Sequence, residues 1–335
     1  MNAPMGSLPM LFELSGEHPT LPTAEALACL RAEAPGFHQI GSGPGYLIVK
    51  GDAGRMGRAV DRLALTHRAG HYLGSCGLDA LERTAAGLDL PPGSVCVRVR
   101  AVQGLYPEVD TYALARKVGN ALSSAHAIDL TSPAMYVRVL LSDEAHLFLV
   151  EREIDRRSFE RRKVAERPFF SPISLHPRYA RALINLTEAR AGDRLLDPFC
   201  GTGGIVIEAA LMGMKAIGSD IDPAMVDGCR RNLRHFGLEA EVEVADVGDV
   251  PEMFGEVAAV ATDPPYGRAA STRKEDLDTL YSRGMRSMAR TLAPGGRAGV
   301  VLPIEAGAEG LELQELHRQR VHRSLTRHYH VFIRR

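Results

Sequence analysis

Several features that mark specialised classes of protein are missing from this sequence. The five cysteines form no CxxC pair and lack disulfide or metal-ligand spacing, so we expect reduced thiols and no bound metal. No apolar run is long enough for a membrane-spanning helix and no signal-peptide pattern is present, so we expect no membrane association. These absences predict a cytoplasmic protein.

The charge balance is also without a strong bias. The net charge is −1, so the chain as a whole has no attraction to a polyanion, and a nucleic-acid surface would have to be a local basic patch. Of the 335 residues, 45% are hydrophobic and 24% are charged, which is typical of globular proteins. The length predicts two or three domains.

The amino-terminal half contains a small α+β pattern. Residues 94–101 alternate apolar and polar side chains, which predicts a half-buried strand. A helix is expected to begin after Asp110, and two strands, 135–142 and 145–153, follow it.

A stretch dense in charge, 154–170, separates this pattern from the rest of the chain. We interpret it as a linker. Two interpretations remain open: the linker is solvated, or its arginines, among them Arg161 and Arg162, contact phosphates.

From residue 171 onward, strands and helices alternate. The expected strands are 194–197, 215–220, 241–246, 257–263 and 296–303, and the expected helices are 180–189, 204–213, 223–237 and 276–292. This alternation predicts an α/β domain with a doubly wound, Rossmann-like sheet that has helices on both faces. Ligands of such sheets bind at the carboxyl ends of the strands.

A glycine-rich turn, in "LLDPFCGTGG" at 195–204, follows the first of these strands. Gly201 and Gly203 remove Cβ atoms where the backbone turns into a helix and where a ligand can approach closely. The turn is not GxGxxG, because Val206 takes the place of the third glycine, so a dinucleotide is disfavoured.

Three successive strands of this domain end in an acid. Asp197 suits the amino group of an amino acid, Asp220 suits ribose hydroxyls, and Asp246 suits the exocyclic amine of adenine. A nucleoside with an amino-acid tail satisfies this set, which predicts S-adenosylmethionine as the cofactor. A single acid would be uninformative, since such acids often cap helices. The predicted cofactor site comprises Asp197, Phe199, Gly201, Gly203, Asp220, Ile221, Asp246 and Val247.

The stretch "DPPY" at 263–266 follows a fourth strand. Alone, it would be an ordinary turn. Together with the cofactor motifs, it resembles the catalytic motif of class I S-adenosylmethionine-dependent methyltransferases that methylate amino groups, over about residues 170–335. The resemblance implies that Asp263, Pro264, Pro265 and Tyr266 form the catalytic site.

This motif suits a planar nitrogen. The lone pair of an exocyclic amine on a base is delocalised, so the amine is a poor nucleophile. The Asp263 carboxylate and the Pro264 carbonyl would accept its two N–H groups and direct the lone pair to the methyl, and the prolines fix that geometry in advance. Tyr266 would stack on the base, which is worth about 1–3 kcal/mol.

The amino-terminal half extends the resemblance. The segments "VRVRA", "ALARKVGNAL" and "IDLTSPAMYVRVLL" make residues 91–153 similar to a THUMP domain, and residues 1–90 resemble the ferredoxin-like segment that precedes it. With "RPFFSPISLHPRYARALINL" at 167–186, most of the chain resembles archaeal tRNA guanine-N2 methyltransferases acting at position 10. The resemblance implies a tRNA methyltransferase whose catalytic domain is 171–335.

Alternatives within this class are a guanine-N2 enzyme acting at tRNA position 6 or on ribosomal RNA. A non-catalytic RNA-binding protein is a more distant one. Local basic residues are expected to contact RNA, namely Arg98, Arg100, Arg116, Lys117, Arg161 and Arg162. The basic carboxyl-terminal segment 317–335 is either a further patch of this kind or a strand hairpin with a solvated face.

Overall fold

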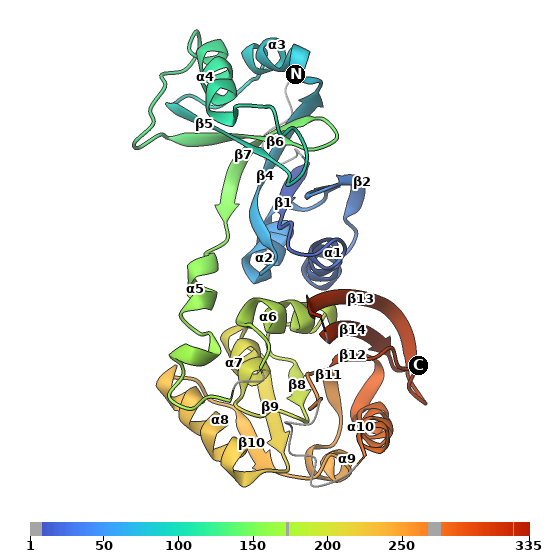
Figure 1. Cartoon of the computed structure of the whole chain (residues 1–335). Helices are drawn as coiled ribbons and strands as arrows, with labels where there is room; N and C mark the ends of the chain where they lie inside the picture. Colours follow the sequence, from blue (N-terminus) through green and yellow to red (C-terminus); the bar gives the residue numbers. More distant parts are fainter. Residues whose placement is uncertain (1–8, 172–173, 267–275, 324) are drawn as a thin grey trace. The chain divides into compact units, whose positions relative to one another are not determined.

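A computed structural model describes residues 9–171, 174–266, 276–323 and 325–335. The chain forms two compact units, and the main division falls between Ile154 and Asp155 (Figure 1).

The first unit is a mixed sheet with four helices among its described residues. Its strands are β1 (Met10–Leu14), β2 (His38–Gly43), β3 (Tyr46–Lys50), β4 (Thr66–Cys76), β5 (Val95–Ala101), β6 (Met135–Leu141) and β7 (Ala145–Glu153). Its helices are α1 (Leu21–Glu33), α2 (Ala53–Arg62), α3 (Leu81–Ala86) and α4 (Thr111–Leu122). The strands pair in the order β2-β3-β1-β4-β7-β6-β5. One sheet therefore runs through both predicted parts, 1–90 and 91–153, and the boundary between them stays a prediction.

The strand–helix–strand–strand pattern expected after residue 93 is confirmed by β5, α4, β6 and β7. The Asp110 carboxylate caps α4 by accepting hydrogen bonds from the amides of Tyr112 and Ala113, at 2.9 and 3.0 Å. Val118 and Leu122 of α4 are buried in the core that this helix forms with α3, β5, β6 and β7.

The charged stretch 154–170 is folded rather than extended and solvated. Asp155 caps a short helix, α5 (Arg156–Glu160), by accepting from the amides at its start. Phe159 of that helix and Arg167 further on are buried. Both residues belong to the second unit, whose main segment is Asp155–Arg335.

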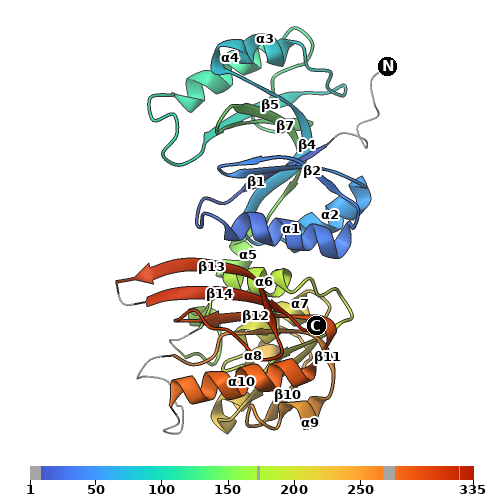
Figure 2. The same cartoon turned by 90° about the vertical axis from the view of Figure 1, so that its right-hand side faces the viewer.

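The second unit is a doubly wound α/β fold, as predicted. Its strands are β8 (Arg194–Asp197), β9 (Lys215–Asp220), β10 (Glu241–Val244), β11 (Val257–Thr262), β12 (Leu292–Leu302), β13 (Glu312–His322) and β14 (Leu325–Ile333). Its helices are α6 (Pro177–Leu186), α7 (Gly204–Leu211), α8 (Pro223–His235), α9 (Val250–Phe254) and α10 (Leu277–Thr291). Figure 2 shows α9 and α10 on one face of the sheet and α6, α7 and α8 on the other.

The strand order of this sheet, β10-β9-β8-β11-β12-β14-β13, contains a reversal. From β8 the chain proceeds to β9 and β10 on one side, and then crosses over to β11 and β12 on the other. The loops that leave β8 and β11 therefore diverge at the carboxyl edge. Such a switch point is where open α/β sheets bind ligands.

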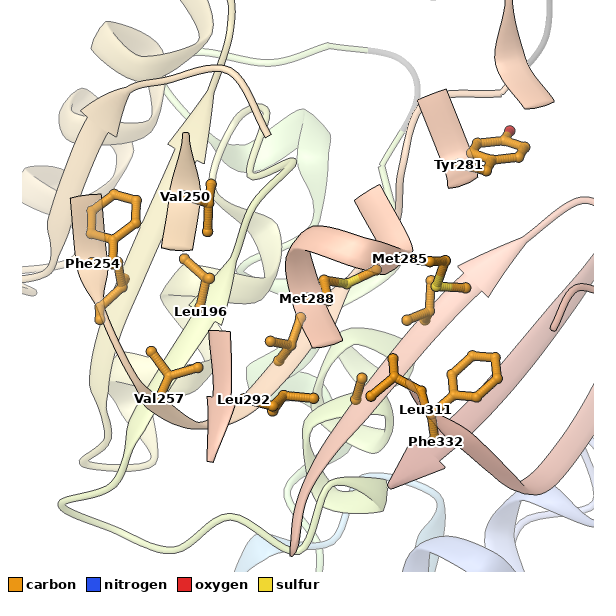
Figure 3. Packing of buried hydrophobic residues seen from close by; sticks show 14 of the residues in the cluster. Leu196, Val250, Phe254, Val257, Tyr281, Met285, Met288, Leu292, Leu311 and Phe332 are labelled. Atoms are coloured by element: carbon orange, nitrogen blue, oxygen red, sulfur yellow. The ribbon is translucent and has the colours of Figure 1, made fainter. Parts of the chain in front are cut away.

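A hydrophobic core beneath α9 and α10 holds these strands in place. In Figure 3, Leu196 of β8 and Met288 of α10 lie among the side chains of this cluster, which also includes Phe332 of β14. All three are at most 1% exposed. Because α10 covers the strands on both sides of the switch point, this packing fixes the ends of β8 and β11 relative to each other.

Two predicted elements need comment. Helix 180–189 is displaced: α6 begins at Pro177, because the Nδ1 atom of His176 accepts from the Arg178 amide at 3.2 Å and a proline suits the first helical position. It ends at Leu186, and Glu188 has a left-handed φ of 59°. The carboxyl-terminal segment forms a hairpin of β13 and β14, and β14 also pairs with β12, whereas a contact of this segment with RNA stays a prediction.

Phe169 anchors the folded linker on α8. Its amide and carbonyl exchange hydrogen bonds with the side chain of Asn232, at 3.0 and 2.7 Å. Its ring occupies the space above Gly228, where a Cβ atom would lie 2.0 Å from Cδ1 of the phenylalanine. Gly228 is therefore required by packing rather than by its backbone conformation.

We predict that Gly228→Ala destabilises the protein by about 1–3 kcal/mol, although alanine normally favours a helix over glycine by about 1 kcal/mol. Gly119 of α4 is the matched control, because no described atom lies within 4 Å of the position of its Cβ. Gly119→Ala should stabilise the protein slightly. Urea denaturation of both variants measures these changes, and a stabilising Gly228→Ala would contradict the packing described.

Candidate active site

A hydrogen bond joins the carboxyl ends of β8 and β11. The hydroxyl of Thr262 donates to Oδ1 of Asp197 at 2.6 Å, and the amide of Phe199 donates to the same oxygen at 3.2 Å. Asp197 is 2% exposed. Burial raises the pKa of its carboxyl to about 7, although both hydrogen bonds oppose the shift.

Asp220, at the end of β9, holds the glycine-rich turn. Its Oδ2 accepts from the amide of Gly201 and its Oδ1 from the amide of Asp222, both at 2.9 Å. Burial raises the pKa of this carboxyl. The sequence predicted Asp220 as a ligand for ribose hydroxyls, and the structure gives it this additional structural role.

The two glycines of the turn differ in their surroundings. Gly203 has φ +84°, and a Cβ atom on it would lie 2.4 Å from Sγ of Cys229, so the helix packing requires glycine there. Gly201 has φ +49°, and a Cβ atom on it would meet no described atom within 4 Å. Gly201 thus borders open space at the end of β8.

The third acid, Asp246, is engaged differently from the expectation. Arg283 of α10 forms an ion pair with both of its carboxylate oxygens, and the amide of Gly248 donates to Oδ1 at 2.7 Å. Its role toward an adenine stays a prediction. Sequence reasoning missed Arg283, which lies 37 positions further along the chain.

Two apolar residues of the predicted cofactor site, Phe199 and Val247, lie beside α10. Phe199 and Val247 both approach Gly284: a Cβ atom on this glycine would lie 3.3 Å from the phenylalanine ring and 3.8 Å from Cγ2 of the valine. Phe199 also lines a small apolar cavity together with Pro264. Ile221, which directly follows Asp220, is half-buried.

Asp263 follows β11 directly, and one oxygen of its carboxyl group is buried without a hydrogen-bond donor among the described residues. The Oδ1 atom is buried and accepts no hydrogen bond from any residue that the structure describes. Burial raises the pKa of this carboxyl to about 7, and the nearby charge of Arg327 opposes the shift. A buried acceptor of this kind is costly unless a ligand provides a donor.

The carbonyl groups of the two prolines that follow differ in their hydrogen bonding. The hydroxyl of Tyr281, labelled in Figure 3, donates to the carbonyl of Pro265 at 2.9 Å. Within the described part of the chain, no donor reaches the carbonyl of Pro264. Oδ1 of Asp263 and the carbonyl of Pro264, which both lack a donor among the described residues, are therefore neighbouring acceptors in the chain.

Tyr266 completes the motif. The residue is 8% exposed, and its hydroxyl accepts a hydrogen bond from Nε of Arg327 at 2.9 Å. Gly267, which follows it in sequence, lies outside the described residues. Arg327 was expected only as part of the basic segment 317–335, and its place beside Tyr266, 61 positions away, was not predicted.

The predicted RNA-contacting residues have different environments. Arg98, Arg116 and Lys117 are exposed, whereas Arg100 donates to the buried Glu13 at 2.7 Å. Arg161 is exposed beside Asp155.

Arg162 is largely engaged within the protein, and its contact with RNA stays a prediction. Its side chain is 13% exposed and holds the buried Glu208 with two hydrogen bonds, at 2.7 and 3.2 Å. Because the guanidinium is committed to this carboxylate, the geometry does not favour a phosphate contact for Arg162. Arg181 of α6 donates to the same carboxylate at 2.9 Å.

Two further properties concern the described residues only. No three His, Cys, Asp or Glu side chains among them gather closely enough to hold a metal ion. None of the helices in the described ranges is long and apolar enough to span a membrane.

Comparison with known proteins agrees with this site. The family model "UPF0020: RMKL-like, methyltransferase domain" matches residues 165–328. Over 330 residues, the chain is 38% identical to a Methanothermobacter thermautotrophicus protein named "tRNA (guanine(10)-N2)-dimethyltransferase", covering 95% of this chain and 97% of the relative. A Thermus thermophilus protein named "tRNA (guanine(6)-N2)-methyltransferase" is 36% identical, and the alignment covers 67% of this chain and 68% of the relative.

A solved structure has a similar fold over nearly the whole chain. The crystal structure of TrmN from Thermus thermophilus aligns with 98% of this chain and 100% of its own, with a TM-score of 0.55 and 26% identity. The fold and the site thus define an α/β methyltransferase. More particularly, the chain belongs to the family of tRNA guanine-N2 methyltransferases.

The raised pKa of Asp263 leads to a prediction about stability. The folded protein retains a proton that the unfolded chain releases near the ordinary value of 3.8, so the free energy of unfolding should fall as the pH rises from about 4 to about 7. One such carboxyl contributes a slope of up to about 1.4 kcal/mol per pH unit. Asp263→Asn should therefore reduce the slope that chemical denaturation measures between these pH values.

The exposed Asp227 of α8 provides the control, and Asp227→Asn should leave the slope unchanged. If Asp263→Asn and wild type lose stability equally over this range, Asp263 is not protonated in the fold.

Proposed function

We propose that this protein is a cytoplasmic enzyme that transfers methyl groups from S-adenosylmethionine to the N2 amine of guanosine 10 in tRNA. The observation that carries the proposal is the buried Oδ1 of Asp263, which has no donor among the described residues, next to the equally unengaged carbonyl of Pro264. An amine with two N–H groups satisfies both acceptors. The name and near full-length similarity of the Methanothermobacter relative support the nucleotide and a capacity for two methylations.

The residues at the ends of β8 and β9 fit S-adenosylmethionine. Burial disfavours the ionised forms of Asp197 and Asp220, and a cation bound beside them would offset this penalty. Asp197 would hold the amino group and Asp220 the ribose, while the space beside Gly201 admits the ligand. When bound, the cofactor supplies a methyl group on a sulfonium and departs as S-adenosylhomocysteine.

The DPPY residues prepare the amine. Oδ1 of Asp263 and the carbonyl of Pro264 would accept one N–H each, which draws the nitrogen lone pair out of the aromatic system and orients it for in-line attack. The hydrogen bond from Tyr281 to the next carbonyl holds the proline segment rigid, so this orientation needs little reorganisation. Tyr266 would stack on the base.

The chemical balance requires one proton to leave. The lone pair of N2 forms the new N–C bond, the electrons of the broken S–C bond remain on sulfur, and one N–H proton passes to the Asp263 carboxylate. A carboxyl whose pKa is near 7 suits this base at neutral pH better than an ordinary aspartate would.

The first unit supplies a surface that suits tRNA. Arg116 and Lys117 of α4 and Arg98 of β5 are exposed, and Tyr112 of α4 is 85% exposed. Lysine and arginine attract phosphates, and an exposed tyrosine offers a stacking face for a base. The THUMP assignment of residues 91–153 forms part of this proposal.

Guanosine 6 is the second candidate nucleotide. Similarity to the Thermus relative named for that position favours it.

The first test is Asp263→Ala. We expect transfer of labelled methyl to unmodified tRNA to fall by at least about 100-fold, because one of two aligned acceptors is lost. Cofactor affinity, measured by calorimetry, should change little. Asp227→Ala serves as the control for a lost surface carboxylate. Full activity of Asp263→Ala would refute the mechanism.

The second test identifies the product. Nuclease digestion and mass spectrometry of the treated tRNA should yield N2-methylguanosine and N2,N2-dimethylguanosine, and primer extension should stop at position 10. A stop at position 6 would support the second candidate, whereas methyladenosine would refute the proposed substrate.

A third test addresses the cofactor. Gly201 and Gly237 both have positive φ, +49° and +65°, and a Cβ atom on either would meet no described atom within 4 Å. Their alanine variants should lose similar stability, about 1 kcal/mol. Only Gly201→Ala should weaken S-adenosylmethionine binding, by at least about tenfold, since its methyl group enters the cofactor space. Equal affinities in a titration would refute this placement.

A further inference from the structure

Arg327 lies at the carboxyl edge of the parallel strands although it belongs to an antiparallel one. In the pairing of β12 with β14, Leu302, the last residue of β12, lies opposite His328. Arg327 is the next residue beyond that pair, on the side where β11 ends and Asp263 follows. The register therefore brings this arginine to the catalytic motif.

Among the described residues, only one nitrogen of the Arg327 guanidinium forms a hydrogen bond. Its Nε atom donates to the hydroxyl of Tyr266, which fixes the group at the edge of the tyrosine ring. Its two terminal amino groups meet no hydrogen-bond acceptor among the residues in the described ranges. The side chain is half-buried, and its charge acts on Asp263. A half-buried guanidinium with unused donors suits a ligand with acceptors.

We infer that Arg327 is a specificity residue: its terminal amino groups bind the O6 and N7 acceptors of the target guanine, while Asp263 and Pro264 hold the N2 amine. This inference rests on the proposed function. A base stacked on Tyr266 would present one edge to Asp263 and another edge to the tyrosine hydroxyl, where Arg327 stands.

The chemistry separates guanine from other purines. Arginine pairs well with guanine because O6 and N7 are both acceptors, whereas a 6-amino group places a donor against the guanidinium. A purine that keeps the N2 amine but carries a 6-amino group should therefore be a poor substrate. That base is 2,6-diaminopurine.

The experiment compares two tRNA transcripts that differ only in carrying guanosine or 2,6-diaminopurine at the methylated position. Wild type should prefer guanosine in kcat/KM by at least about tenfold. Arg327→Met should reduce this preference at least about fivefold, and Arg327→Lys should give an intermediate value. Arg320→Met removes an exposed arginine from the same hairpin and should leave the preference unchanged.

The ratio of kcat/KM between the two transcripts distinguishes a role in base recognition from a role in positioning Tyr266. If Arg327 only positioned Tyr266, both substrates would lose activity equally. If both transcripts lose activity equally in Arg327→Met and Arg327→Lys, so that the ratio is unchanged, the inference is wrong. Methylation by wild type would still support the proposed function in that case. Absence of N2-methylation by wild type would instead refute the proposed function itself.

Discussion

The site depends on the hydrogen bond between Thr262 and Asp197. It joins β8, which ends in the cofactor acid Asp197, to β11, which leads into Asp263, at the switch point between these two strands. The loops after β8 and β11 part there, so two ligands can meet between them. The core beneath α10 supports this junction, because Leu196 and Met288 pack under the same strands.

The carboxyl groups of Asp197, Asp220 and Asp263 lie near this junction. Asp197 is raised in pKa by burial and, to a smaller extent, by the charges of Asp263 and Asp220. A structure selected only for stability would replace such groups with apolar ones, since burying unpaired carboxyls is costly. The cost is consistent with a site that awaits a cation and an amine, both of which the proposed reaction brings.

The local features of this site could be predicted from the sequence, whereas the long-range ones could not. Strand ends, glycine turns and the DPPY motif are encoded by neighbouring residues, so Asp197, Gly203 and Asp263 were identified correctly as features of strand ends and turns. Arg283 and Arg327 were missed because their partners lie 37 and 61 positions away. Only the packing of α10 and the insertion of β14 beside β12 bring them near.

The sheet also separates two chemical tasks by position. Asp220 and Asp197 end the neighbouring strands β9 and β8 at one side of the carboxyl edge, and a positively charged nucleoside derivative suits this row of acids. Beyond β11 the row ends, and the antiparallel β14 contributes Arg327 to the other end. A neutral base rich in acceptors suits that end better than a cation does. The antiparallel strand thus changes the sign of the charge along the edge, and Asp263 stands where the two regions meet.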